Sequence, residues 1–95
     1  MSGFAAMPER EVIIVNRRGL HARAAAKFVK LAQSFEATVD VEKAGIKVSG
    51  LSIMGLMMLA ATPGTTLMLR AEGPAADAAL CALNRLVASG FDETD

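Results

Sequence analysis

The one histidine of this sequence, His21, lies where an extended stretch gives way to a helix-forming one. Residues 11–16 are rich in β-branched side chains and predict a strand. Residues 22–33 are rich in alanine, carry apolar side chains at helical spacing, and predict a helix. Gly19 allows the chain to bend sharply between the two. The imidazole is therefore expected at, or just before, the first turn of a helix.

A helix that starts at His21 offers backbone N–H groups without helical partners and the positive end of the helix dipole. This field favours a bound phosphate and disfavours the imidazolium, so the ring stays neutral and nucleophilic near pH 7. Arg23 adds a fixed charge that can donate paired hydrogen bonds to phosphate oxygens. Together these features predict a site that carries a phosphoryl group on the ring.

Two plainer interpretations of His21 stay open from the residues alone. One is an ordinary surface or helix-capping histidine. The other is the general base of a small hydrolase, for which no nucleophile and no second acid or base is identifiable nearby, since Cys81 falls on another predicted helix, away from its core stripe. One histidine and one cysteine are too few for a structural zinc site, and we expect neither a metal nor a cofactor.

The elements that would position the site alternate along the chain. Apolar–polar alternation and helical stripes predict strands at 11–16, 37–43, 46–49 and 65–72, and helices at 22–33, 53–60 and from Pro74 to Gly90. The order β-α-β-β-α-β-α favours an α+β open-faced β-sandwich, a four-stranded antiparallel sheet with three helices on one face. We expect residues 1–10 to be a flexible N-terminal lead-in, 11–95 a single domain, and 91–95 a short acidic tail.

Composition narrows the class of protein further. The chain has 95 residues, 53% of them hydrophobic, and its ten basic and ten acidic side chains cancel. That balance argues against a nucleic-acid partner. The N-terminus lacks the pattern of a signal peptide, and the longest apolar stretch, 53–61, is far short of the ~20 residues that span a bilayer. We expect a cytoplasmic monomer without membrane insertion.

An apolar surface is expected after Ser52, which is a good helix N-cap. Apolar residues point in almost every direction around the short helix at 53–60. Because a helix on an open sheet buries one side, we expect Ile53, Met54 and Met57 to form an exposed patch, although burial of both sides is an alternative. Methionines suit a surface that binds several partners.

A basic face on the first helix, made of Arg23, Lys27 and Lys30, begins two residues after the histidine. It is compatible with acidic partner surfaces. A plain solvated helix face is the alternative.

Two motifs carry a resemblance to a known family. Gly-Leu-His-Ala-Arg-x-Ala at residues 19–25 resembles the active-site signature of the HPr family, the histidine-containing phosphocarriers of the bacterial phosphoenolpyruvate-dependent phosphotransferase system. Ser-Ile-Met-Gly-Leu-Met at residues 52–57 resembles the regulatory-serine segment of the same family. The strand–helix order and the length also match, so the resemblance covers nearly all of the chain beyond residue 10.

The resemblance implies a carrier rather than an enzyme. His21 would accept phosphate on Nδ1 from phospho-enzyme I and pass it to enzyme IIA proteins, with Arg23 stabilising the phosphate and Asn16 in a supporting position. Ser52 would be the target of an HPr kinase/phosphorylase. The implied partner-binding residues are Ile53, Met54, Met57, Lys27 and Lys30.

Two positions depart from the family pattern, Ala24 where proline is frequent and Leu51 where a basic residue is frequent. We expect the start of the first helix to survive with Ala24 in place of proline, slightly less rigid, because alanine is acceptable in a first turn. The alternative function is a regulatory protein-binding module, switched by phosphorylation of Ser52 or His21 and without a direct role in sugar uptake.

Overall fold

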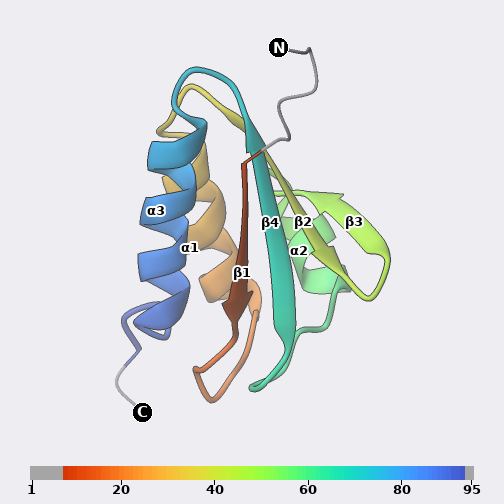
Figure 1. Cartoon of the computed structure of the whole chain (residues 1–95). Coiled ribbons are helices and arrows are strands. Elements are labelled where there is room, and N and C mark those ends of the chain that lie inside the picture. The colour runs from red at the N-terminus through yellow and green to blue at the C-terminus, as the bar shows by residue number, and fades with distance from the viewer. Residues whose placement is uncertain (1–7, 94–95) are drawn as a thin grey trace.

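The computed structural model describes residues 8–93, in which four strands and three helices follow one another in the predicted order (Figure 1). The strands are β1 (Glu9–Ile13), β2 (Thr38–Lys43), β3 (Ile46–Ser49) and β4 (Thr66–Glu72). The helices are α1 (Ala22–Ala32), α2 (Ile53–Met58) and α3 (Ala76–Ala88).

The four strands form one antiparallel sheet in the order β1-β4-β2-β3. Val12 pairs with Leu67, and Val41 pairs with Leu69, so the alternating apolar residues of neighbouring strands meet on the same side. Helix α3 contacts β1, β4 and α1, and helix α2 contacts α1 and β3 (Figure 1). The predicted open-faced α+β sandwich is confirmed.

The core lies between the apolar face of the sheet and the helices. Helix α1 contributes mostly small residues, with Ala24 and Ala25 fully buried beside the larger Phe28. The buried residues of α1 are Ala24, Ala25, Phe28 and Ala32, whereas Val29 is only half-buried. The largest fully buried side chains are Phe28, Phe91, Ile14, Leu56, Leu67, Leu69, Leu83, Val39, Val41 and Val87.

The first strand lies closer to the N-terminus than the sequence suggested. It begins at Glu9, which pairs with Arg70, and ends at Ile13, which pairs with the first residue of β4. Beyond this pair the two segments stay joined by backbone hydrogen bonds, from the Ile14 N–H to the Thr65 carbonyl at 2.9 Å and from the Gly64 N–H to the Ile14 carbonyl at 2.8 Å. Residues 9 and 10 thus belong to the sheet rather than to a lead-in, and residues 1–7 lie outside the described range.

Two helix boundaries also differ from the prediction. Helix α3 begins at Ala76 with Ala75 as its N-cap, because Gly73 and Pro74 form a turn in which the Ala76 N–H donates to the Gly73 carbonyl at 3.2 Å. Helix α2 ends at Met58, two residues early, since the backbone at Ala60 takes a left-handed conformation with φ of +50°. No helix within residues 8–93 is long and apolar enough to span a membrane.

The end of the chain is the largest departure. Gly90 ends α3 as predicted, with φ of +68° and a Schellman pattern in which the Phe91 N–H donates to the Leu86 carbonyl at 2.9 Å. The next residues then turn back to the protein, and Phe91 is fully buried. We call residues 90–93 the C-terminal hook. The predicted short acidic tail thus packs against the protein at Phe91 and Glu93, whereas Asp92 is exposed and residues 94–95 lie outside the described range.

Candidate functional site

His21 lies at the start of α1, as predicted. It is the N-cap residue, in an extended conformation, and its carbonyl accepts the first helical hydrogen bond from the Ala25 N–H at 2.8 Å. The ring makes no capping hydrogen bond. The backbone of His21 therefore starts the helix while its imidazole stays available for other contacts.

The bend before His21 requires glycine. Gly19 has φ of +66°, and a Cβ built there would lie 2.3 Å from the carbonyl oxygen of Ala61. The next residue, Leu20, donates its N–H to that same oxygen at 2.9 Å. This close approach holds the turn before His21 against the loop between α2 and β4.

Asn16 holds the same turn from the other side. Its side chain is 6% exposed, and Nδ2 donates to the Gly19 carbonyl at 2.8 Å and to Glu93 Oε1 at 3.0 Å. The main chain closes the turn as well, since the Gly19 N–H donates to the Asn16 carbonyl at 3.1 Å. The structure thus places Asn16 directly behind the histidine.

Glu93 is the site residue that the sequence reasoning missed. Its Oε2 pairs with His21 Nε2, across 72 positions of the chain, and the Glu93 side chain is only 10% exposed. Hydrogen bonds from His21 and Asn16 lower the pKa of Glu93, so the carboxylate is charged near neutral pH. The sequence alone identified no second acid or base near the histidine, and the structure places Glu93 there.

The C-terminal hook that carries Glu93 is fixed at two points. The Phe91 ring is buried in the core, and the Phe91 carbonyl accepts a hydrogen bond from Lys27 Nζ at 2.7 Å. A large aromatic residue directly after a helix-ending glycine is a sequence signal for such a return to the core. Of the predicted basic face, Lys27 is thus engaged within the protein and half-buried, whereas Lys30 is exposed.

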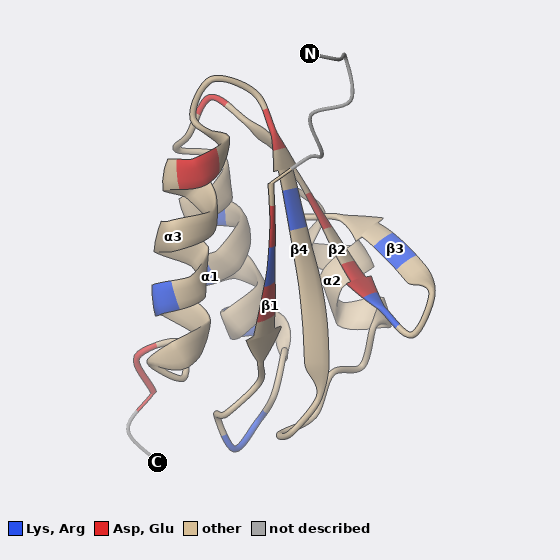
Figure 2. Ribbon diagram, in the orientation of Figure 1, with Lys and Arg blue, Asp and Glu red and all other residues tan. Residues whose placement is uncertain are grey.

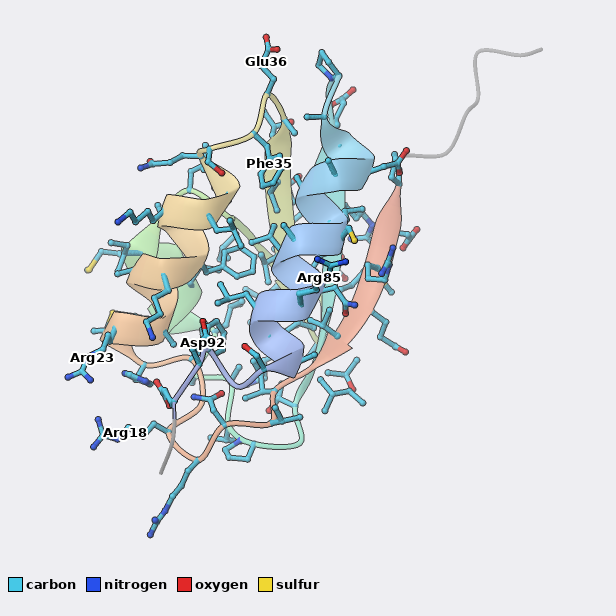
Figure 3. The ribbon with its side chains drawn as sticks, turned by 90° about the vertical axis from the view of Figure 1, so that its left-hand side faces the viewer. Arg18, Arg23, Phe35, Glu36, Arg85 and Asp92 are labelled. Atoms are coloured by element: carbon cyan, nitrogen blue, oxygen red, sulfur yellow. The ribbon has the colours of Figure 1, made fainter. Side chains whose placement is uncertain are left out.

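Charges of both signs lie near the start of α1. Arg23 is exposed, and its guanidinium has no hydrogen-bond or ion-pair partner among residues 8–93. Figure 3 shows Arg18 and Arg23 pointing outward at the end of the molecule where α1 begins. In Figure 2 the acidic residues of the C-terminal hook lie at this same end. Of these side chains, the exposed Arg23 guanidinium is the one that an anion approaching the ring would meet.

The short helix α2 divides into two sides as predicted. Leu56 is fully buried, whereas Met54 and Met58 are 72% and 78% exposed. Ile53 and Met57 are exposed to a lesser degree. We call the exposed set the α2 patch; it consists of Leu51, Ile53, Met54, Met57 and Met58, of which Leu51 and Met58 were not predicted.

Ser52 is the N-cap of α2, as predicted, and its Oγ accepts a hydrogen bond from the Gly55 N–H at 2.9 Å. The serine is half-buried beside the α2 patch. Within residues 8–93 the His21 ring pairs with Glu93 and the Ser52 hydroxyl with the Gly55 N–H, so the two side chains have separate hydrogen-bond partners.

The geometry around His21 defines a class of site. Nε2 of the ring is engaged by Glu93, the ring is 23% exposed, and Nδ1 is the nitrogen left for an incoming group. The start of α1 and Arg23 add donors for an anion. These are the parts of a carrier of phosphoryl groups, which must present its histidine to other proteins.

The comparisons with known proteins agree with this class. A family model described as "PTS HPr component phosphorylation site" matches residues 8–89. The phosphocarrier protein HPr of Pseudomonas putida is 50% identical over 88 residues, which cover 92% of this chain and 98% of that protein. The chain therefore belongs to the HPr family, phosphocarrier proteins of the phosphotransferase system, and is not an enzyme.

Solved structures show the same fold. A crystal structure of HPr-C-His from Thermoanaerobacter tengcongensis superimposes with a TM-score of 0.89 at 43% identity, covering 94% of this chain and all of that one. A crystal structure titled as an HPr dimer from the same organism has a TM-score of 0.73 at 44% identity, covering 92% of this chain and 100% of that one.

Ala24, the departure from the family pattern at the active site, leaves the helix start intact. Helix α1 begins at Ala22 as expected, and Ala24 is fully buried. Leu51, the other departure, is exposed at the edge of the α2 patch, where it adds apolar area beside Ser52.

Proposed function

We propose that His21 is the phosphorylated residue of this phosphocarrier, accepting a phosphoryl group on Nδ1 from phospho-enzyme I and passing it to an enzyme IIA protein. The observation that carries the proposal is the placement of the ring. It lies at the start of α1, partly exposed, with Nε2 occupied by Glu93 and Nδ1 left for the phosphorus atom.

In the transfer, one bond to phosphorus forms while another breaks. The Nδ1 lone pair forms a bond to phosphorus while the bond between phosphorus and the donor breaks, and the donor keeps that electron pair. The phosphoryl oxygens are then stabilised by the unpaired N–H groups of the first turn of α1 and by the Arg23 guanidinium. No step requires a metal or cofactor.

We propose the α2 patch together with Arg23 and Lys30 as the surface that meets enzyme I and enzyme IIA. Exposed methionines adapt to different partner surfaces, and the two cations favour acidic ones. Both partners must reach His21 at the start of α1. The α2 patch is close enough to take part in the same contact, because α2 packs against α1. We further propose that the carrier acts in the cytoplasm as a monomer, which size-exclusion chromatography at assay concentrations tests.

Ser52 is our proposed regulatory site, modified by an HPr kinase/phosphorylase. A phosphate there would place about two negative charges beside the α2 patch. Because an acidic partner would be repelled, the modification would weaken docking without touching the ring. A kinase assay with ATP that compares the protein with Ser52→Ala tests this part alone.

A second candidate function follows from the same patch. Since the α2 patch and Ser52 lie outside the His21 hydrogen-bond network, the protein could regulate other proteins through docking, with no direct role in sugar uptake. Transfer from the phosphorylated carrier to the enzyme IIA of a sugar permease separates the two functions. Rapid transfer supports uptake; phosphorylation without transfer to any permease component supports regulation.

The deciding experiment uses labelled phosphoenolpyruvate and enzyme I. We expect the protein to acquire a phosphate that is labile in acid and stable in alkali, and His21→Ala to acquire none. Ser52→Ala is the matched control and should be labelled like the unmodified protein. Failure of the unmodified protein to take up label, or equal labelling of His21→Ala, would overturn the proposal.

A further inference from the structure

We propose that Glu93 is a positioning residue for phosphoryl transfer, holding the His21 ring in the tautomer that leaves the lone pair on Nδ1. This inference rests on the proposed function of His21 and assigns a role to the C-terminal hook. The role follows from which atoms can donate and which can only accept.

The first step concerns the carboxylate. Ionised glutamate has two acceptor oxygens and no donor. Its Oε2 is paired with His21 Nε2 and its Oε1 with Asn16 Nδ2. In a neutral imidazole one nitrogen carries the proton and the other the lone pair. Facing a carboxylate, Nε2 must be the protonated nitrogen, which leaves Nδ1 as the nucleophile.

The second step concerns the direction of the network. The Asn16 amide donates one N–H to the Gly19 carbonyl at 2.8 Å and the other to Glu93 Oε1 at 3.0 Å. Turning this amide around would place its oxygen against the Gly19 carbonyl. The Gly19 carbonyl therefore fixes the orientation of the Asn16 amide, with its NH₂ group as the donor. The Glu93 oxygen that Asn16 contacts must then be an acceptor, as a carboxylate oxygen is. Asn16 thus donates to Glu93, and the His21 ring donates to the other oxygen of the same carboxylate.

The third step concerns charge during transfer. When Nδ1 bonds to phosphorus while Nε2 keeps its proton, positive charge develops on the ring. A carboxylate already paired with Nε2 stabilises that charge without reorganising. In the return direction the same pairing keeps Nε2 protonated, so the ring departs from phosphorus as a neutral imidazole. Glu93 thus supports both the loading and the unloading of the carrier.

The fourth step concerns rigidity. A carboxylate at the free end of a chain would lose much of its effect to motion. Here the C-terminal hook is anchored by the buried Phe91 ring and by the bond from Lys27 Nζ to the Phe91 carbonyl. The Glu93 carboxylate is placed by these contacts before any partner arrives.

The test uses Glu93→Gln. This substitution keeps the size of the side chain but replaces one of the two equivalent acceptor oxygens with an NH₂ donor. Because Asn16 donates a hydrogen bond at this position, the glutamine side chain must present its amide oxygen to Asn16. Its NH₂ group then faces His21. It then donates to Nε2 and favours the tautomer with the proton on Nδ1. Since His21 is the one histidine of the chain, the ¹⁵N signals of its ring report the tautomer directly.

Asp92→Asn is the matched control, because Asp92 is the adjacent acid and lines the groove between α1 and α3 rather than contacting the ring. We expect Glu93→Gln to move the neutral ring toward the Nδ1–H form, and Asp92→Asn to leave it in the Nε2–H form. A purely structural role for Glu93 would leave the tautomer unchanged.

The second readout is the rate of phosphoryl transfer from enzyme I. Loss of a charge-assisted hydrogen bond that strengthens in the transition state corresponds to a drop in rate of about tenfold or more. We expect this drop for Glu93→Gln and for Glu93→Ala, with Glu93→Asp intermediate and Asp92→Asn unchanged.

The outcomes separate this inference from the proposed function. Suppose that His21 takes up label, and that Glu93→Gln shows the same ring tautomer and the same transfer rate as Asp92→Asn. The role of Glu93 is then overturned, while the proposal that His21 carries the phosphoryl group remains supported. If His21 takes up no label at all, both fail. Thermal unfolding of each variant shows whether a slow transfer rate comes from loss of folding. A well-folded Glu93→Gln variant whose ring keeps the Nε2–H tautomer would also refute the inference.

Discussion

The two proposed phosphorylation sites of this protein, Ser52 and His21, each begin a helix, and they do so in different ways. Ser52 caps α2 with its own side chain, through a hydrogen bond to a backbone N–H three positions away. His21 caps α1 with its backbone alone, and its ring reaches instead to Glu93, 72 positions away. The serine site is local, whereas the histidine site is assembled from both ends of the chain.

The difference fits the roles that we propose for the two side chains. A ring that forms and breaks bonds to phosphorus must have one nitrogen free and the other held, which needs partners placed by tertiary structure. A serine that is modified by another protein needs accessibility and a local conformation, which neighbouring residues supply. The histidine site is therefore sensitive to distant substitutions, and the serine site is not.

The largest expected effect comes from Phe91→Ala, which removes the buried anchor of the C-terminal hook. Truncation of a buried phenylalanine costs about 3–5 kcal/mol of the free energy of unfolding. Urea denaturation measures it, with Leu51→Ala on the exposed α2 patch as control, expected within about 0.5 kcal/mol of the unmodified protein. A loss below about 1 kcal/mol for Phe91→Ala would mean that the hook is not part of the core.

The next effect is expected at the turn before His21. In Gly19→Ala a Cβ would lie 2.3 Å from the Ala61 carbonyl oxygen at a φ of +66°. We expect destabilisation by about 2 kcal/mol or more, from backbone strain and the clash. Gly45→Ala is the matched control, since Gly45 has φ of +87° but nothing within 4 Å of its built Cβ. Equal losses in the two variants would contradict the importance of the close approach.

A smaller effect is expected at the serine site. Ser52→Ala removes the capping acceptor of α2 and should lower the free energy of unfolding by about 1 kcal/mol. Ser52→Thr retains a hydroxyl and should recover most of this loss. Because the cap is local, transfer of phosphate to His21 should stay unchanged in both variants. A slowed transfer would show that the two helix starts are coupled.

The smallest effect is the pH dependence of the histidine site. Folding lowers the pKa of Glu93 below 4.5, the ordinary value for glutamate. Its carboxylate therefore stabilises the folded protein at pH values above 4.5, and this stabilisation is lost as the pH falls through the lowered pKa. The difference in melting temperature between the unmodified protein and Glu93→Gln should therefore shrink as the pH falls from 6 toward 3. A constant difference over this range would contradict the pairing.

Much of this molecule could be predicted from local sequence. The alternation around Val39 and Val41, the glycine that ends α3, and the serine that begins α2 act over a few residues, so their patterns are visible in the chain. The same holds for His21 at the start of α1 and for the exposed Met54. Strand and helix ends shifted by a few residues, because pairing partners such as Thr66 set where a strand begins and ends.

The sequence by itself thus determined the order of elements, the place of the histidine at a helix start, and the family to which the motifs point. Only the tertiary structure decided what holds the ring. Glu93 looks like part of a solvated tail in the sequence, because no short-range pattern links it to His21. Burial of Phe91 brings the end of the chain back to the start of α1, and this long-range packing places a carboxylate on Nε2 of the ring.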